Sequence, residues 1–198
     1  LQYLHQPDPN TDLRESAEAL QRLREMGLIR YAGISNATLA ECQLFHSICP
    51  IAAVQIPFNM LQPNTYRELV DWCTNNQISI FSFWVLMKGL FAGKIERTTQ
   101  LDANDRRRTY PMYQSHQWDI NQDFVDVLRR LAAQLGWSVA QLVVRWSLER
   151  PGMTSCLVGA KRPEQIMESA AALQAPLPPD LTHEIEAAIA ARLTNGDP

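Results

Sequence analysis

Hydrophobic residues follow two different spacings along this 198-residue chain, and the two spacings alternate. Short runs rich in β-branched and aromatic residues are typical of buried strands, whereas apolar positions three and four apart are typical of amphipathic helices. The first spacing predicts strands at 1–6, 29–35, 52–57, 78–83 and 154–159. The second predicts helices that begin at or near Asp12, Asn36, Pro63, Asn121, Ser138, Pro163 and Pro178, the last of them a terminal helix over 178–193.

Residues that favour helix ends support these boundaries. Asp12 is followed three residues later by Glu15, which predicts a capping box at the start of the first helix. Gly27 stands where a left-handed residue closes that helix. Asn36 is expected to cap the second helix, and Pro63 to occupy the first turn of the third, where its missing N–H costs nothing.

Strands that alternate with helices predict a parallel sheet with right-handed crossovers. An open doubly wound sheet and a (β/α)₈ barrel both satisfy this order. No GxGxxG follows any strand, and the GLFAGK segment lacks the glycine spacing and the Ser or Thr of a phosphate-binding P-loop. A barrel needs about 250 residues and eight strands. The chain is therefore expected to be a single domain over 1–198 that represents the last five β/α units of a barrel.

Composition narrows the class of protein. The chain is 46% hydrophobic and 20% charged with a net charge of −3, which gives no reason to expect nucleic acid or a membrane as partner. Four cysteines without CxxC spacing predict reduced thiols in a cytoplasmic protein, and the scattered histidines predict no metal site. The oligomeric state is left open. The chain starts with Leu1 in the middle of a predicted strand, so we expect a fragment or a processed chain.

Polar or glycine residues stand at the end of each predicted strand. They include His5, Ser35–Asn36, Gln55, the glycine loop after Phe83, and 159–162. The carboxyl ends of parallel strands converge on one rim, where ligands bind. The stretch Ile78–Lys94 is the clearest case, since a buried strand changes abruptly into a loop with two glycines and two lysines. Residues 95–118 form a long connection, which inside a compact domain is usually functional or disordered. Its three consecutive arginines either serve that function or belong to a solvated surface.

Five blocks of the sequence together resemble the aldo/keto reductase family, and the similarity runs from Leu1 to about Leu173. The blocks are LHQPDP, GLIRYAGISN, VQIPFNML, FSFWVLMKGLFAGK and VGAKRPEQIMES. The resemblance implies a (β/α)₈ barrel that binds NADPH at its C-terminal rim and reduces aldehydes or ketones. It also implies a small-molecule carbonyl substrate, whose identity the sequence does not reveal.

The resemblance assigns roles to single positions. His5 matches the histidine that orients the substrate carbonyl. Phe83 matches an aromatic residue that stacks on the nicotinamide ring. The carboxamide of that ring is assigned to Ser35, Asn36 and Gln55. The pyrophosphate is assigned to the loop through Leu86, Lys88, Gly89 and Leu90. The 2′-phosphate, which favours NADP over NAD, is assigned to Gly159, Lys161 and Arg162. The adenosine is assigned to Gln165 and Glu168, with 95–118 as a long cofactor-side loop.

The sequence departs from the family pattern at several places. Trp84 replaces a small residue, Val85 a proline and Ser169 an asparagine. None of the five tyrosines matches the family's proton donor, and its lysine and aspartate partners belong to earlier strands. Hydride transfer to a carbonyl needs such a donor. The 198-residue chain alone is therefore expected to be inactive, with His5 as its only catalytic residue.

Two other interpretations stay open at this point. One is a non-catalytic nucleotide-binding or regulatory module, since the potassium-channel β subunits resemble reductases but act mainly through a partner. The other is an inactive truncated product. The sequence upstream of Leu1 discriminates between them and the enzyme, because a tyrosine and a lysine at the family positions favour catalysis.

Overall fold

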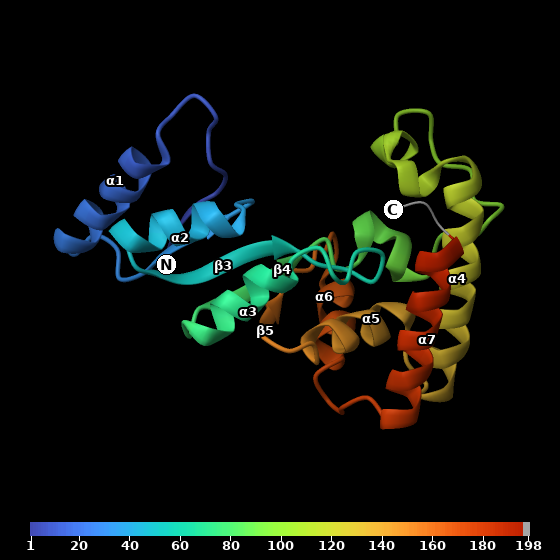
Figure 1. Cartoon of the computed structure of the whole chain (residues 1–198). Helices are drawn as coiled ribbons and strands as arrows, with labels where there is room; N and C mark the ends of the chain where they lie inside the picture. Colours follow the sequence, from blue (N-terminus) through green and yellow to red (C-terminus); the bar gives the residue numbers. More distant parts are fainter. Residues whose placement is uncertain (196–198) are drawn as a thin grey trace. The chain divides into compact units, whose positions relative to one another are not determined.

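The structure is a computed structural model that describes residues 1–195, and it divides into two compact units (Figure 1). The sheet unit comprises Leu1–Phe58, Asn64–Phe83 and Arg150–Leu157. The helical unit comprises Asn59–Pro63, Trp84–Glu149 and the described residues from Val158 onward.

The sheet unit contains one five-stranded parallel sheet in which chain order and spatial order agree. Its strands are β1 (Gln2–Leu4), β2 (Ala32–Ser35), β3 (Ile51–Pro57), β4 (Ser79–Phe83) and β5 (Met153–Cys156). All four pairings are parallel, as the alternation of strands and helices predicts. Within the described residues the sheet is open, because β1 pairs only with β2 and β5 only with β4.

The two faces of the sheet differ in burial. Val54, Ile56 and Ile80 are at most 2% exposed and occupy one face. The helices α1 (Leu13–Glu25), α2 (Leu39–Ile48) and α3 (Arg67–Asn75) pack around this part of the unit, with α1 against β2 and α3 against β4. The alternate positions of the strands, such as Gln55 and Phe81, are only half-buried. One face is thus a packed core and the other is partly open.

The start of α1 differs from the prediction in one detail. Asp12 is the N-cap, but its carboxylate accepts the backbone N–H of Arg14 at 2.9 Å, so the predicted capping box with Glu15 is wrong. The shorter aspartate side chain reaches the second helical residue instead of the third. Gly27 has φ +73°, which confirms that a left-handed residue closes this helix.

Two other helix starts were predicted wrongly. Thr38, not Asn36, caps α2, in a capping box with Glu41. Asn36 has φ +54°, whereas an N-cap residue needs extended backbone. Pro63 does not enter a helix, since it lies in a series of turns and α3 begins only at Arg67.

The helical unit consists of four α-helices and three short 3₁₀ helices within the described residues. These are η1 (Met87–Ala92), η2 (Arg106–Thr109), η3 (Pro111–Tyr113), α4 (Ser115–Gln134), α5 (Val139–Leu148), α6 (Pro163–Ala171) and α7 (Pro179–Asn195). Ser138 caps α5 in a capping box with Gln141, as predicted for the serine. Helices α4 and α7 run side by side (Figure 1).

Helix α4 begins six residues earlier than its apolar spacing predicts. Its first turns are held by polar contacts, because the buried guanidinium of Arg192 on α7 donates to Asn121 Oδ1 at 3.1 Å and to Gln117 Oε1 at 2.9 Å. The spacing of apolar residues does not predict these turns, because they pack against α7 through amide side chains. In the part of the chain that the structure describes, no helix combines the length and the hydropathy required to cross a membrane.

Candidate functional site

The strand-end residues of the sheet unit gather at the carboxyl ends of β1 and β2. His5 lies exposed just beyond β1, and Ser35 is the last residue of β2 and 1% exposed. The Asn36 amide joins them, since its Nδ2 donates to the backbone oxygen of His5 at 3.0 Å and to Ser35 Oγ at 3.2 Å. The left-handed backbone at Asn36 turns the side chain toward both partners. Asparagine adopts this conformation more readily than most residues.

Two further predicted residues lie on the adjoining strands. Gln55 pairs with Ser35 in the register of β2 and β3, and Phe83 ends β4 opposite Pro57. Both side chains are half-buried. The sheet unit therefore presents hydroxyl and amide groups, an imidazole and an aromatic ring along the same ends of four strands. The roles assigned to these residues remain predictions.

Tyr3 is a polar residue of this face that sequence reasoning left out. Its hydroxyl is buried without a well-formed hydrogen bond among the described residues, although the Gln55 side chain lies nearby. Burial raises the pKa of Tyr3, and the proximity of Gln55 partly opposes this effect. Tyr3 and His5 are two residues apart, so strand periodicity alone places them on one face. This two-residue spacing is the sequence signal by which Tyr3 could have been included in the predicted site.

The loop that follows β4 has an unusual backbone. Trp84, Met87 and Lys88 have φ values of +59°, +42° and +53°, and Gly89 has φ +100°. Each positive φ at a residue other than glycine costs about 1–3 kcal/mol and persists only where the surroundings enforce it, commonly at ligand-binding segments. The loop is buried against its own unit through Met87 and Leu90. The residues predicted to hold a pyrophosphate thus lie in a strained and well-packed turn.

Lys88 is fixed by aromatic neighbours within this loop. Its ammonium lies 4.5 Å from the ring centroid of Trp84 and 4.6 Å from that of Tyr110. Its backbone oxygen accepts a hydrogen bond from the Tyr113 hydroxyl at 3.3 Å. Two cation–π contacts hold the charge near the loop without neutralising it. Trp84, which departs from the family pattern, therefore serves as one wall for Lys88.

The arginine segment reaches the same loop. The Arg107 guanidinium lies beside Gly89, where an added Cβ would stand 3.7 Å from its Nη1. Arg107 Nε donates to both carboxylate oxygens of Asp105, at 2.9 and 3.0 Å. Arg106 and Arg108 stay exposed. Of the two interpretations of these arginines, the contact with Gly89 supports the functional one at Arg107.

Asp105 supplies a test of this arrangement. The Arg107 side chain, and less strongly its backbone N–H and the charge of Lys161, lowers the pKa of the Asp105 carboxyl from 3.8 to about 2. A depressed folded-state pKa means that the pair stabilises the fold fully above pH 4 and loses this effect as the pH falls toward 2.

We expect NMR of the Asp105 carboxyl carbon to give a titration midpoint near pH 2. Arg107→Gln should move this midpoint back toward 3.8, the ordinary value, while Arg106→Gln should leave it unchanged. A midpoint near the ordinary value in the unmodified chain would contradict the ion pair.

The last group of predicted residues surrounds the start of α6. The side-chain oxygen Oε1 of Gln165 accepts hydrogen bonds from the backbone N–H groups of Lys161 at 2.7 Å and Arg162 at 3.2 Å, and thereby caps the helix. Glu168 forms an ion pair with Lys94 at 3.2 Å. The side chains of Lys161 and Arg162 are exposed, and nothing lies within 4 Å of a Cβ added to Gly159. An open glycine beside two exposed cations suits a phosphate group.

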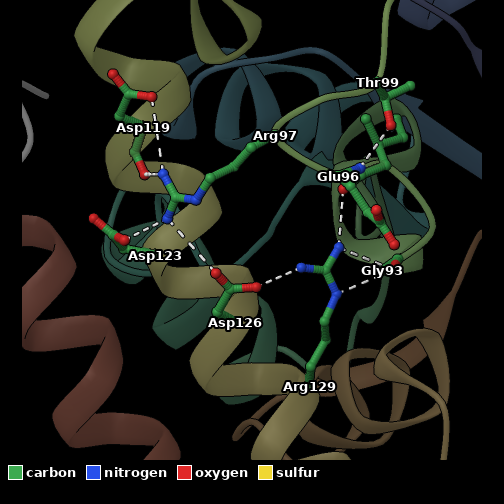
Figure 2. Close-up of polar contacts among 9 residues, drawn as sticks. Gly93, Glu96, Arg97, Thr99, Asp119, Asp123, Asp126 and Arg129 are labelled. Atoms are coloured by element: carbon green, nitrogen blue, oxygen red, sulfur yellow. Dashed lines mark hydrogen bonds and ion pairs between the residues drawn. The ribbon is translucent and has the colours of Figure 1, made fainter.

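An arginine network holds the chain that leaves the glycine loop against α4 (Figure 2). Arg97 pairs with Asp119, Asp123 and Asp126, and Asp126 also pairs with Arg129. Arg129 then donates to the backbone oxygens of Gly93 at 3.1 and 3.2 Å and of Ile95 at 2.9 Å. The segment from Gly93 to Arg97 is consequently tied to the helix at both ends.

The donor chemistry of each unit, taken separately, fits one part of the predicted cofactor. Hydroxyl and amide groups in the sheet unit match the needs of a carboxamide, and the cations and strained loop of the helical unit match those of phosphates. Within the described residues, no group of three or more metal-ligating side chains occurs, and the four cysteines are free thiols.

The family model and the curated relatives that match this chain agree with one another. A model of the aldo/keto reductase family matches residues 1–190. An aldo-keto reductase of Bacillus subtilis is 30% identical over 167 residues, which cover 84% of this chain and 50% of that protein. An L-glyceraldehyde 3-phosphate reductase of Escherichia coli O157:H7 is 31% identical over 180 residues, covering 86% of this chain and 52% of that protein. The chain thus spans about half the length of these curated relatives.

Solved structures support the fold. A glycerol dehydrogenase of Gluconobacter oxydans superimposes with a TM-score of 0.90 at 26% identity, covering 99% of this chain and 60% of that one. A thermostable aldo-keto reductase in complex with the inhibitor epalrestat shares the fold at 21% identity, with a TM-score of 0.70 over 94% of this chain and 58% of that one. The predicted α/β fold class is confirmed, with five parallel strands of the barrel type in an open sheet.

Proposed function

This chain belongs to the aldo/keto reductase family, and from this membership we propose that the whole protein reduces an aldehyde or ketone to the alcohol with NADPH. The observation that carries the proposal is the family match over residues 1–190, because every predicted cofactor residue lies inside it. The nicotinamide of the cofactor supplies the hydride.

The residues of the sheet unit position the reacting groups in this proposal. His5 donates a hydrogen bond to the substrate carbonyl oxygen and sets its orientation. Asn36 supports His5 through the 3.0 Å hydrogen bond to its backbone. Ser35 and Gln55 bind the carboxamide, and Phe83 stacks on the ring. The opposite face of the nicotinamide is thereby presented to the substrate carbonyl. Fixed orientation of two reactants supplies a large part of a catalytic rate enhancement.

The residues of the helical unit hold the phosphates and the adenosine. Leu86, Lys88 and Gly89 surround the pyrophosphate, with Arg107 as an added cation beside Gly89. Lys161 and Arg162 meet the 2′-phosphate next to Gly159. Gln165 and Glu168 contact the adenosine. Gln165 does so with side-chain atoms other than the helix-capping Oε1, and Glu168 does so beside its ion pair with Lys94. Paired cations at the 2′-phosphate give the preference for NADP over NAD.

We further propose that the proton donor comes from residues outside this chain, so that the 198-residue chain carries cofactor residues and a substrate-orienting histidine without the acid. The cytoplasm is the proposed compartment, since its reducing conditions suit the four free thiols.

The cofactor preference has a direct test in a protein extended by upstream barrel strands. Arg162→Ala is expected to raise KM for NADPH by about tenfold or more, because a charged hydrogen bond to phosphate contributes about 1.5–3 kcal/mol. KM for NADH should change less than twofold, since NADH has no 2′-phosphate.

Arg130→Ala is the matched control, because Arg130 is exposed on α4 and lies outside the predicted site. It should leave both constants unchanged. Equal effects of Arg162→Ala on NADPH and NADH would overturn the assignment of the 2′-phosphate. Failure of the extended protein to oxidise NADPH with any carbonyl would overturn the proposed activity.

A further inference from the structure

The helical unit contains a cavity of about 370 Å³. Its lining lies within 95–118, the predicted cofactor-side loop, but includes none of the residues to which a single part of the cofactor was assigned. It lies between the chain that leaves the glycine loop, the short helices η2 and η3, and the first turns of α4. Its lining residues are Thr99, Gln100, Leu101, Arg108, Tyr113 and Trp118. Cavities of roughly 300–1,000 Å³ hold small organic ligands in proteins. This volume suits a molecule of one or two rings.

The polar groups of the lining are mostly donors without a partner. The Arg108 guanidinium, the Gln100 amide and the Trp118 indole N–H form no hydrogen bond or ion pair with the described residues. The neighbouring Arg107, in contrast, forms hydrogen bonds to the Asp105 carboxylate. Unpaired donors around a guanidinium favour an acceptor-rich anion, and a planar carboxylate matches the guanidinium geometry best.

Two aromatic rings form most of the apolar part of the lining. The rings of Tyr113 and Trp118 are stacked, with centroids 5.6 Å apart and planes inclined by 25°. Both side chains are half-buried, as is Leu101. Aromatic faces and edges favour planar, polarisable ligands. The aromatic pair therefore suits the ring of a ligand, and Arg108 suits its negative charge.

The lining is held in place before any ligand arrives. Thr99 Oγ1 accepts the backbone N–H of Glu96 at 2.9 Å, within the segment that Arg97 and Arg129 hold against α4 (Figure 2). On the other side, the Tyr113 hydroxyl donates to the Lys88 oxygen. Burial raises the pKa of Tyr113 to about 12, so the hydroxyl keeps its proton at neutral pH. A preorganised lining lowers the ordering cost of binding.

We propose that this cavity binds a small planar organic anion, an aromatic carboxylate in chemical class, with Arg108 meeting the carboxylate and the Tyr113–Trp118 pair contacting the ring. The proposal does not rest on the proposed function, because binding is measured without cofactor or carbonyl. It makes the cavity a second ligand site, joined to the glycine loop through Tyr113 and Lys88.

The test is a titration of the full chain with 2-naphthoate, followed by NMR of ¹⁵N-labelled tryptophan. The chain has five tryptophans, so each indole N–H gives one signal, and Trp118→Phe assigns the signal of interest. The Trp118 signal is expected to shift saturably, while the signals of Trp72 and Trp137 stay in place. No shift of the Trp118 signal up to about 5 mM 2-naphthoate, a binding free energy weaker than about −3 kcal/mol, would overturn the proposal.

Paired variants separate the site from general charge attraction. Arg108→Gln is expected to weaken binding by about tenfold, the cost of losing a charge-assisted hydrogen bond. Arg106→Gln removes an exposed charge that does not line the cavity, so it should change binding less than twofold. The unshifted signals of the other tryptophans report that each variant is folded. Equal weakening by both variants would overturn the role of Arg108.

Two ligand controls complete the experiment. The neutral analogue 2-naphthamide should bind at least about tenfold more weakly than 2-naphthoate if the carboxylate meets Arg108. Saturating NADP⁺ should leave the 2-naphthoate titration at Trp118 intact. Equal binding of the amide would remove the case for an anion, and displacement by NADP⁺ would show that the cavity belongs to the cofactor site.

Discussion

The 198-residue chain on its own is expected to reduce an aromatic aldehyde at least about 100-fold more slowly than a protein extended by the upstream barrel strands, because a positioned general acid contributes about 10²–10⁴ in rate. The proposal assigns His5 to orienting the carbonyl and not to protonating the developing alkoxide. The measurement is NADPH oxidation with 4-nitrobenzaldehyde by both proteins at equal concentration.

Cofactor binding must be measured beside this rate, since loss of NADPH binding alone also abolishes turnover. Quenching of tryptophan fluorescence by NADPH supplies that readout for both proteins. In the extended protein, replacing the added donor tyrosine by phenylalanine should lower the rate by a similar factor with little change in NADPH affinity. Turnover by the short chain within about tenfold of the extended protein would contradict the proposal that the acid lies outside this chain.

Gly33→Ala is expected to lower the free energy of unfolding by up to about 3 kcal/mol, the range observed when an atom is forced into a packed interior. Gly33 lies in the middle of β2. An added Cβ would stand 2.5 Å from Cε1 of Tyr3 and 2.8 Å from the backbone oxygen of Ala53. The tyrosine ring can move, but the carbonyl belongs to the neighbouring strand, so the substitution must widen the spacing of β2 and β3.

Gly159→Ala is the matched control for urea unfolding. Nothing lies within 4 Å of its added Cβ, so the variant should be unchanged or stabilised by about 0.4–1 kcal/mol through the unfolded chain. Because Tyr3 must shift in Gly33→Ala, its hydroxyl should also lose its buried environment and titrate at a lower pH. Equal free energies of unfolding for the two alanine variants would mean that the β2–β3 spacing accommodates a Cβ at position 33 without cost.

The sequence was most informative where one periodicity decided the outcome. Buried runs predicted parallel strands with Ser35, Gln55 and Phe83 at or near their carboxyl ends, and the sheet has this arrangement, with Gln55 two residues before the end of β3 at Pro57. The carboxyl ends of β2, β3 and β4 are those predicted, but β1 ends at Leu4 and β5 at Cys156, before the predicted ends at 6 and 159. A two-residue period locates a strand, whereas its last residue depends on pairing with the neighbouring strand.

The predictions failed where competing local signals had to be weighed against the tertiary structure. Asn36 and Thr38 are both good caps, and only the left-handed backbone at Asn36, set by its bonds to His5 and Ser35, decides for Thr38. Likewise, no apolar period in 95–118 reveals that Arg107 lies beside Gly89, because that contact joins residues distant in the chain.

The arginine network on α4 has a consequence for the kinetics of binding. Arg97 and Arg129 share Asp126, so the segment that leaves the glycine loop and the Thr99 side of the cavity are anchored to the same helix (Figure 2). A ligand that meets an already ordered segment avoids an ordering cost of about 0.5–1.5 kcal/mol per side chain. The anchored segment therefore favours association in a single step, without a slow closing motion after the first encounter.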